Sequence, residues 1–222
     1  GNLVMGLTAE RMAHQSGGVL FLRVEDTDAK REVPGAVEVL IDSLKHYNIL
    51  FDEGATHTGD NGIYGPYRQR QRAEIYHVFA RELVLKGMAY PCFCTEEELN
   101  AMRETQQEQK LNFGYYGEWA KCRNLSMEEI EENIKAGKPY VVRLKSPGKI
   151  GGRVKYKDVV KGDIEMDENV ADIVLLKTDG IPTYHFAHAC DDTLMGTTHV
   201  VRSDEWVPSV NIHLQLFYCL GL

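Results

Sequence analysis

FLRVEDTD, at residues 21–28, joins an apolar strand to a packed run of acidic side chains. We predict a strand over residues 18–24 and a helix over residues 34–47, which together make one β-to-α step. In an α/β protein, ligands bind at the carboxyl ends of the parallel strands. The acids that follow Val24 therefore predict a binding site at the end of this strand.

The composition is that of an ordinary globular chain. Its 222 residues are 43% hydrophobic and 26% charged, which is enough to bury a core. The sequence contains no run of 18 apolar residues and no basic-then-apolar leader, so we expect a cytoplasmic protein without a membrane partner. Five irregularly spaced cysteines suit reduced thiols or a partial metal site. The net charge of −8 argues against sequence-blind nucleic-acid binding, although a local basic face could hold a folded RNA.

Hydrophobic periodicity predicts the other elements. The predicted helices cover residues 3–15, 69–86, 183–195 and 210–220, and the predicted strands cover residues 140–145, 154–160, 173–177 and 199–202. Two capping boxes, Thr95 with Glu98 and Ser126 with Glu129, predict the start of two more helices. The order is β/α, then an antiparallel-looking insert, then β/α again. It predicts an α/β protein whose doubly wound parallel sheet is interrupted by an α+β insertion.

Four blocks in series resemble the bacterial glutamyl-tRNA synthetases, a family of class I aminoacyl-tRNA synthetases. Residues 21–28 are similar to the FLRIEDTD block of that family, and residues 179–187, DGIPTYHFA, to its DG-x-PTYH-x-A segment. Residues 191–196, DDTLMG, and residues 199–206, HVVRSDEW, resemble its DD-x-LMG and VIRGEEW blocks.

This resemblance implies a domain organisation. Residues 1–87 and 182–222 would be the two halves of a Rossmann-type catalytic domain, and residues 88–181 would be a connective insertion that binds the acceptor end of tRNA. The family's HIGH motif would lie before the first helix, with Gly1 as its glycine, and its KMSKS loop would follow residue 222. We therefore expect an inactive fragment of a longer protein, without most of the HIGH motif and all of the KMSKS motif.

The resemblance also implies an activity, that of a glutamate–tRNA ligase. The α-carboxylate of L-glutamate would attack the α-phosphorus of ATP, bound with Mg²⁺, and the 3′-terminal adenosine of tRNA(Glu) would then accept the acyl group. Such chemistry depends on positioning and charge stabilisation, so we assign no catalytic nucleophile. We expect the protein to be a monomer.

Three residues are expected to bind the two ends of glutamate. Glu25 would receive its ammonium group, with a turn or capping acid as the alternative. Arg202 would bind its side-chain carboxylate, because a guanidinium offers two parallel donors and a charge that glutamine cannot neutralise. Tyr184 stands where the family places a tyrosine that contacts the substrate, with a core tyrosine as the alternative. For Arg202 the alternatives are ion pairs with Asp26, Asp191 or Asp204.

Three further positions complete the predicted site. His188 stands where many relatives carry asparagine, four residues after the tyrosine, and would contact glutamate and make binding sensitive to pH. Glu205 resembles a residue that contacts the ribose of ATP. Trp206 would line the glutamate pocket, and either of these last two could instead anchor the following helix.

Three cysteines resemble part of a zinc site found in some family members. They are Cys92, Cys94 and Cys122. Asn124 stands where a histidine would complete the tetrahedron, so we expect no zinc and assign no metal ligand. Tyr115, Tyr116 or a distant group as the fourth ligand is the open alternative.

Two basic runs are candidate RNA contacts. The first contains Lys145, Lys149, Arg153, Lys155 and Lys157, with Tyr156 as a stacking surface. The second contains Arg68, Arg70 and Arg72, at the start of a predicted helix where cations are disfavoured unless they face an anion. Ordinary solvated side chains are the alternative for the first run.

Other functions fit the sequence less well. A glutamyl-queuosine tRNA(Asp) synthetase would share the catalytic core, whereas a glutaminyl enzyme would carry a DDTN-type block in place of EDTD. A dinucleotide-binding oxidoreductase would need a GxGxxG motif between a strand and a helix, which this sequence does not contain. A binding module with a zinc knuckle would need a fourth ligand.

Overall fold

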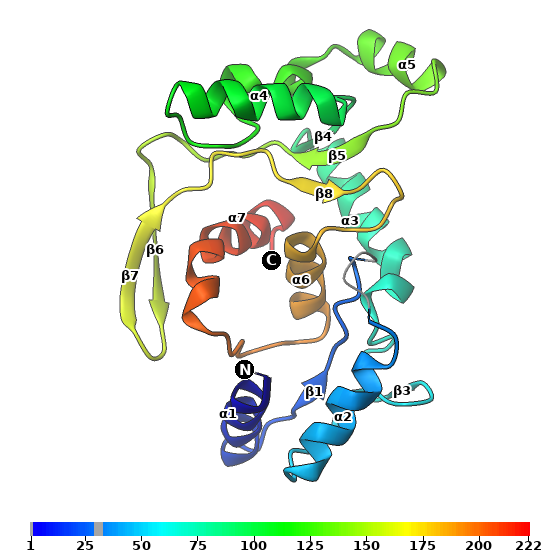
Figure 1. Ribbon diagram of the computed structural model, residues 1–222, viewed down its shortest axis with the longest axis vertical. Coiled ribbons are helices and arrows are strands. Elements are labelled where there is room, and N and C mark those ends of the chain that lie inside the picture. The colour runs from blue at the N-terminus through cyan, green and yellow to red at the C-terminus, as the bar shows by residue number, and fades with distance from the viewer. Residues whose placement is uncertain (1, 29–32) are drawn as a thin grey trace. The chain divides into compact units, whose positions relative to one another are not determined.

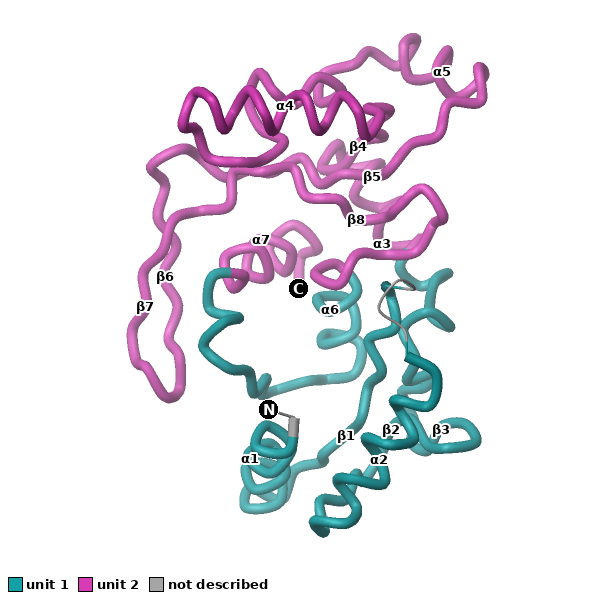
Figure 2. The backbone as a smooth tube through the Cα atoms, in the orientation of Figure 1, with its two compact units in different colours: residues 1–76, 187–208 teal, residues 77–186, 209–222 magenta. Residues whose placement is uncertain are grey.

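The structure is a computed structural model that describes residues 2–28 and 33–222, so the prediction for Gly1 lies outside the described residues. The chain divides into two compact units (Figure 2). Unit 1 comprises Gly1–Tyr76 and Ala187–Pro208, and unit 2 comprises His77–Phe186 and Ser209–Leu222. Each unit is described by itself below.

Unit 1 contains a three-stranded sheet in the order β1-β2-β3 (Figure 1). Its strands are β1 (Phe21–Leu22), β2 (Glu53–Ala55) and β3 (Asp60–Asn61). β1 is parallel to β2, which is antiparallel to β3, and Val24 forms a further parallel bridge with Arg68. Gly54 is required here, because a Cβ on it would lie 2.4 Å from the backbone oxygen of Leu22. The predicted strand over residues 18–24 is thus confirmed, with a shorter span.

Two helices belong to the same unit, α1 (Asn2–Gln15) and α2 (Ala36–His46). Leu44 of α2 is 3% exposed and forms a small core with Leu20 and Ile49. The helix predicted over residues 34–47 begins at Ala36 because Gly35, with φ of 78°, is its N-cap. These contacts set the start of β1 against α2.

Unit 2 contains an antiparallel sheet in the order β4-β5-β8. Its strands are β4 (Ala89–Cys92), β5 (Val141–Leu144) and β8 (Val174–Leu176), and a separate hairpin is formed by β6 (Arg153–Asp158) and β7 (Gly162–Asp167). Helices α4 (Glu96–Glu108) and α5 (Met127–Lys135) both begin with the predicted capping boxes. The short 3₁₀ segments η3 (Gly117–Trp119) and η4 (Lys121–Asn124) lie between these two helices in the chain.

The remaining helices confirm the predicted periodicity. α3 (Ala73–Leu85) follows a 3₁₀ turn, η2 (Gln69–Arg72), so the first turn of the helix predicted over residues 69–86 is 3₁₀. α6 (Tyr184–Leu194) and α7 (Val210–Leu220) lie where helices were predicted. Among the described helices, none combines the length and the apolar character that crossing a membrane requires.

One predicted strand is not formed, and four strands of the described residues were not predicted, namely β2, β3, β4 and β7. Residues 199–202 are irregular chain leading into η5 (Asp204–Ser209), and no described strand pairs with them. A short apolar run does not form a strand without a partner, and Val200 is instead 50% exposed. Conversely, β7 was missed, because the acids on one of its faces hid the alternation of Ile164 and Met166 on the other.

Candidate functional site

Unit 1 contains a pocket of about 1150 Å³ beside β1. Its walls come from α1, from residues 18–25, from α6 and from the irregular segment at residues 195–202. Glu25, His188 and Arg202 all line it, so the structure brings three of the predicted site residues together. Glu25, the first acid after Val24, therefore lies at a concave surface next to a parallel strand, where the sequence predicted a site.

Two arginines and a histidine surround the carboxylate of Glu25. Its Oε1 lies 3.2 Å from Nη2 of Arg23, 3.4 Å from Nη2 of Arg202 and 3.9 Å from Nδ1 of His188. Burial raises the pKa of Glu25, but the imidazole of His188 and the charges of Arg202 and Arg23 outweigh it and lower the pKa to about 2. Glu25 is therefore a fixed negative charge at the pocket wall.

Arg202 lies between this carboxylate and an aromatic ring. Its guanidinium donates to Glu25 and its Cζ lies 5.5 Å from the centroid of the Trp206 ring, within cation–π range. A pairing with Glu25 was not among the ion pairs considered from sequence. Glu205 accepts a hydrogen bond from the hydroxyl of Ser203 at 3.0 Å. Arg202 thus carries a partly exposed positive charge beside the negative charge of Glu25.

Two further charged residues of this site were missed from sequence, Arg23 and Asp192. Arg23 is 7% exposed and donates to Oδ1 of Asp192 at 2.8 Å. Nε2 of His188 lies 3.0 Å from Oδ2 of the same aspartate. The sequence did contain a signal for them, because Arg23 lies inside an apolar strand and Asp192 is one of two aspartates inside an apolar helix. Charged groups are buried only when they are paired, so such residues indicate a buried ion pair.

The carboxylate of Asp191 is fully buried in a further cluster of hydrogen bonds, and its Oδ2 lies 3.9 Å from Nε of Arg23. It accepts hydrogen bonds from Gln69 (3.0 Å), Arg72 (2.7 Å) and the hydroxyl of Tyr76 (2.7 Å). The guanidinium of Arg72 is 3% exposed and also donates to backbone oxygens of residues 64 and 66, so its prediction as an RNA contact was wrong. Asp26 accepts from the backbone N–H of residue 70, so this acid has the turn-stabilising role that Glu25 lacks.

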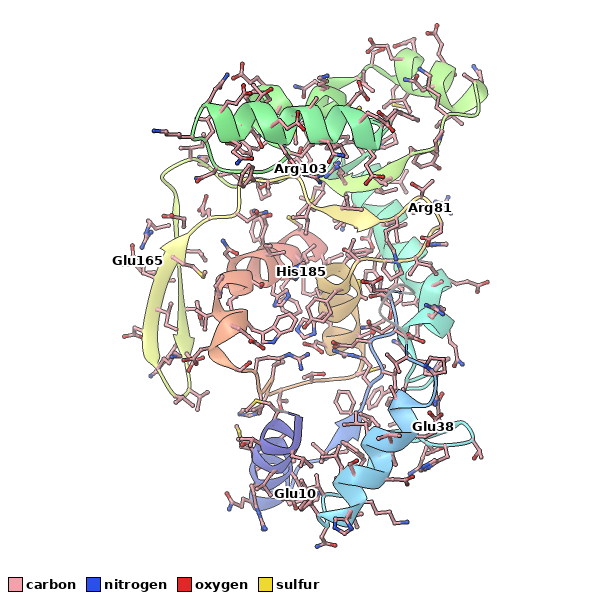
Figure 3. The ribbon with its side chains drawn as sticks, in the orientation of Figure 1. Glu10, Glu38, Arg81, Arg103, Glu165 and His185 are labelled. Atoms are coloured by element: carbon pink, nitrogen blue, oxygen red, sulfur yellow. The ribbon has the colours of Figure 1, made fainter. Side chains whose placement is uncertain are left out.

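Tyr184 belongs to unit 2, where it begins α6. Its ring packs edge-on against the rings of His185 and His213, at centroid distances of 5.2 and 6.1 Å. Nδ1 of His185 and Nε2 of His213 share a hydrogen bond of 2.9 Å; Figure 3 labels His185 on this helix. The orientation of the tyrosine ring is therefore set by a pair of histidines from α6 and α7.

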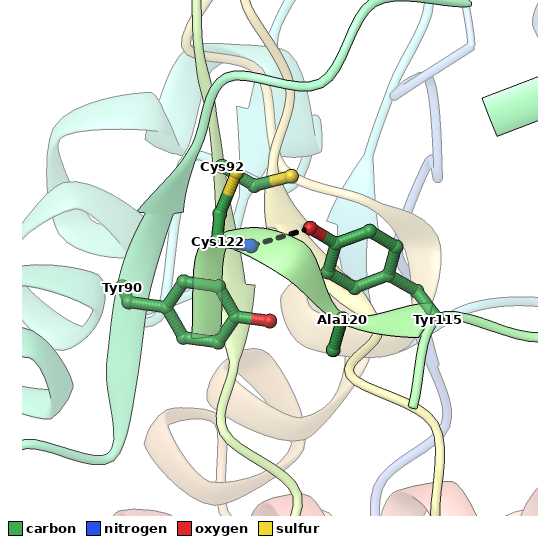
Figure 4. Close-up of a cluster of buried hydrophobic side chains, with 5 residues drawn as sticks. All are labelled: Tyr90, Cys92, Tyr115, Ala120 and Cys122. Atoms are coloured by element: carbon green, nitrogen blue, oxygen red, sulfur yellow. Dashed lines mark hydrogen bonds between the residues drawn. The ribbon is translucent and has the colours of Figure 1, made fainter. Parts of the chain in front are cut away.

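The three predicted thiols lie together in unit 2. The Sγ atoms of Cys92, Cys94 and Cys122 are within 4.8 Å of one another, and all three cysteines are free thiols. The hydroxyl of Tyr115 lies 3.2 Å from Sγ of Cys94 and accepts a hydrogen bond of 3.0 Å from the backbone N–H of Cys122 (Figure 4). Hydrogen bonds from Cys122 and Cys94 lower the pKa of the Cys92 thiol. Three sulfurs lie together with one phenolic oxygen beside them, and the expectation of no zinc stays a prediction that elemental analysis of the purified protein would test.

The first basic run faces acids across the β6–β7 hairpin. Arg153, Lys155 and Lys157 are in register with Asp167, Glu165 and Asp163 respectively. Arg153 pairs with both Asp167 and Glu165, and Lys155 lies 3.4 Å from Glu165, which Figure 3 labels on β7. The exposed face of the hairpin is therefore balanced in charge, and the sequence of β6 alone overstated how basic it is.

The comparisons with known proteins agree with this fold. The profile of the family described as tRNA synthetases class I (E and Q), catalytic domain, matches residues 7–222, and the chain belongs to this family. It is 53% identical to a glutamate–tRNA ligase of Clostridium perfringens (strain 13 / Type A) over 223 residues, and 54% identical to one of Clostridium beijerinckii over 222 residues. All of this chain is covered in both cases, but only 41% and 40% of those proteins, so the chain spans about two fifths of the length of these curated relatives.

A solved structure is similar over nearly the whole chain. It is a crystal structure of a glutamate tRNA ligase from Elizabethkingia meningosepticum in complex with its amino acid, with a TM-score of 0.89 and 36% identity over 98% of this chain and 43% of that one. This similarity confirms the predicted α/β class of a Rossmann-type catalytic domain. Membership of the family rules out the dinucleotide-binding oxidoreductase and the zinc-knuckle module as readings of the sequence.

Proposed function

We propose that this chain is the catalytic region of a glutamate–tRNA ligase, which activates L-glutamate with ATP and transfers it to the 3′-terminal adenosine of tRNA(Glu). The observation that carries the proposal is the contact between Glu25 and Arg202 at the wall of the unit 1 pocket. A negative and a positive side chain in one pocket complement the ammonium and the distal carboxylate of glutamate. The relatives that are more than 50% identical to this chain bear the same name.

Each predicted residue has a role in this proposal. Glu25 binds the ammonium group, and its low pKa keeps it ionised at neutral pH, where the ammonium is charged. Arg202 binds the distal carboxylate, with its guanidinium held over Trp206. Tyr184 and His188 complete the glutamate contacts, and Glu205 contacts the ribose of ATP, which binds with Mg²⁺. No side chain forms a covalent intermediate, so these residues act by positioning and by charge.

We further propose that residues 88–181 are the insertion that binds the acceptor end of tRNA, between the two halves of the catalytic domain at residues 1–87 and 182–222. The capped helices α4 and α5 and the β6–β7 hairpin lie within this range. We also propose a cytoplasmic monomer, because all five cysteines are free thiols, as is usual in a reducing compartment.

The test is aminoacylation of tRNA by the complete gene product that carries these residues. We expect charging with glutamate and little with glutamine, because glutamine would leave the Arg202 charge without a partner. Arg202→Gln should raise KM for glutamate about 10- to 100-fold, which corresponds to losing a charged hydrogen bond of about 1.5–3 kcal/mol, and should leave KM for ATP near its original value.

The matched control is Arg103→Gln, which removes an arginine of α4 that is bonded to Asn100 at the protein surface. It should leave both Michaelis constants unchanged. Charging of glutamine in preference to glutamate, or an Arg202→Gln enzyme with an unchanged KM for glutamate, would refute the proposed role of the pocket.

A further inference from the structure

Arg23 is buried at the pocket wall, where its guanidinium lies near Asp192, Glu25 and His188, and also near Sδ of Met195 at 3.8 Å and Oδ2 of Asp191 at 3.9 Å. Nη1 donates to Asp192 at 2.8 Å, and Nη2 lies 3.2 Å from Oε1 of Glu25 and 3.1 Å from Nδ1 of His188. The side chain is 7% exposed, and its Nε has no hydrogen-bond partner among the described residues. A buried guanidinium with this many neighbours fixes the geometry of the groups around it.

The contact with His188 determines where the imidazole carries its proton. A guanidinium has five donors and no acceptor, so Nδ1 of His188 must accept from Arg23. The proton then resides on Nε2, which donates to Oδ2 of Asp192 at 3.0 Å. Asp192, four residues along α6, thus accepts from Arg23 with one oxygen and from His188 with the other.

Glu25 depends on the same guanidinium. Arg23 and Arg202 both approach Oε1 of its carboxylate, one from the buried side and the other from the pocket side, where Arg202 is 38% exposed. The buried arginine sets the direction of the carboxylate, since its own position is fixed by Asp192. Arg202 is the more exposed of the two arginines.

We propose that Arg23 is a positioning residue of the glutamate site, which fixes the carboxylate of Glu25 and holds His188 as the neutral tautomer protonated on Nε2. The proposal rests on the proposed function for its kinetic consequence, but the tautomer of His188 does not depend on it. Arg23 acts through these two neighbours, so its loss should weaken glutamate binding and leave ATP binding intact.

The first experiment measures the tautomer in the complete gene product labelled with ¹⁵N-histidine. Long-range ¹H–¹⁵N correlation spectra distinguish the two neutral tautomers and the imidazolium, and His188→Asn assigns the signals of His188 by their loss. We expect the Nε2–H tautomer at neutral pH. A proton on Nδ1, in the neutral or the charged form, would overturn the proposal, and this measurement needs no change at Arg23.

The second experiment compares Arg23→Lys with Arg72→Lys. Both substitutions keep a positive charge next to one of two adjacent aspartates of α6, Asp192 and Asp191. Arg72 is equally buried, but its described contacts do not include Glu25 or His188. Arg23→Lys should raise KM for glutamate at least about tenfold with kcat and KM for ATP nearly unchanged, and should alter the His188 signals. Arg72→Lys should lower Tm and leave the glutamate KM and the His188 signals as they are.

Equal effects of the two substitutions on KM for glutamate would show a general packing defect and would overturn the proposal. The experiments distinguish a failure of the proposed function from a failure of the proposed role of Arg23. If the gene product charges no glutamate, the proposed function fails while the tautomer is still measured; if it charges glutamate and Arg23→Lys leaves KM unchanged, only the role of Arg23 fails.

Discussion

At the scale of single residues, Glu25 links the site to the stability of unit 1. Its carboxyl pKa is lowered to about 2 from 4.5, because His188, Arg202 and Arg23 outweigh the effect of burial. A lowered pKa in the folded state stabilises the fold above the unfolded pKa, and this contribution disappears as the pH falls toward the folded value. We expect it to amount to about 3 kcal/mol above pH 5 and to be lost between pH 4.5 and pH 2.

Glu25→Gln should therefore lose stability near neutral pH and show a shallower decline between pH 4.5 and pH 2 than the unsubstituted protein. Urea unfolding at a series of pH values measures both curves. Glu104→Gln, which removes an exposed carboxylate of α4, is the control and should follow the unsubstituted curve. Coincident curves for Glu25→Gln and the unsubstituted protein would contradict the assignment of the low pKa.

At the scale of elements, the start of α4 depends on its capping box. The hydroxyl of Thr95 accepts from the backbone N–H of Glu98 at 3.3 Å, and the Glu98 carboxylate accepts from the N–H of Thr95 at 2.9 Å. Thr95→Ala should cost about 1 kcal/mol, because the backbone N–H of Glu98 loses its acceptor. Thr105→Ala makes the same substitution inside the same helix, where alanine has the higher helix propensity, and should not lower Tm. Equal losses from both substitutions would mean that the cap contributes nothing.

The charge balance of the β6–β7 hairpin gives another prediction at this scale. Replacing Asp163, Glu165 and Asp167 with their amides would free the three cations opposite them for phosphates. The affinity for tRNA should rise, and the slope of log K against log salt should steepen by roughly one unit for each cation that gains a phosphate. Titrations at several salt concentrations measure both quantities.

The control for the hairpin is the triple amide variant at Glu128, Glu131 and Glu132 on α5, which changes the net charge of the protein by the same amount. It should change tRNA affinity much less. Equal changes in the two variants would mean that overall charge, and not the hairpin, governs the affinity, in which case β6 does not bind the RNA backbone.

These elements also show what the sequence could predict. The capping boxes at Thr95 and Ser126 were predicted correctly because their hydrogen bonds join residues three apart. The strand at residues 199–202 was not, because strand formation depends on a partner that local sequence does not specify. Glu25 and Arg202 were found through the resemblance. Arg23 was missed because its importance arises from Asp192 and His188, more than 160 residues away along the chain.

At the scale of the whole molecule, the net charge of −8 is compatible with RNA binding only if cations are concentrated locally. Within unit 1, several of the arginines are already neutralised by Glu25, Asp191 and Asp192. Arg202 lines the pocket with a side chain that is 38% exposed. A small ligand with one distal carboxylate, such as glutamate, is therefore a better match for this pocket than a polyanionic backbone.

Hydrogen exchange with and without a non-hydrolysable glutamyl-adenylate analogue tests this view across the whole chain. Backbone amides become protected where a ligand orders or covers them. We expect protection at residues 20–25 and 195–202, which line the pocket of unit 1, and at the start of α6, where the resemblance places a substrate contact at Tyr184. α5 serves as the internal control, because none of the proposed site residues lies on it.

Protection at the pocket without protection at residue 184 would remove the tyrosine from the glutamate site, whereas no protection at residues 20–25 would contradict the pocket itself. The glutaminyl analogue should protect the same amides more weakly, since it leaves the charge of Arg202 unmatched, and equal protection by both would mean that Arg202 does not select glutamate.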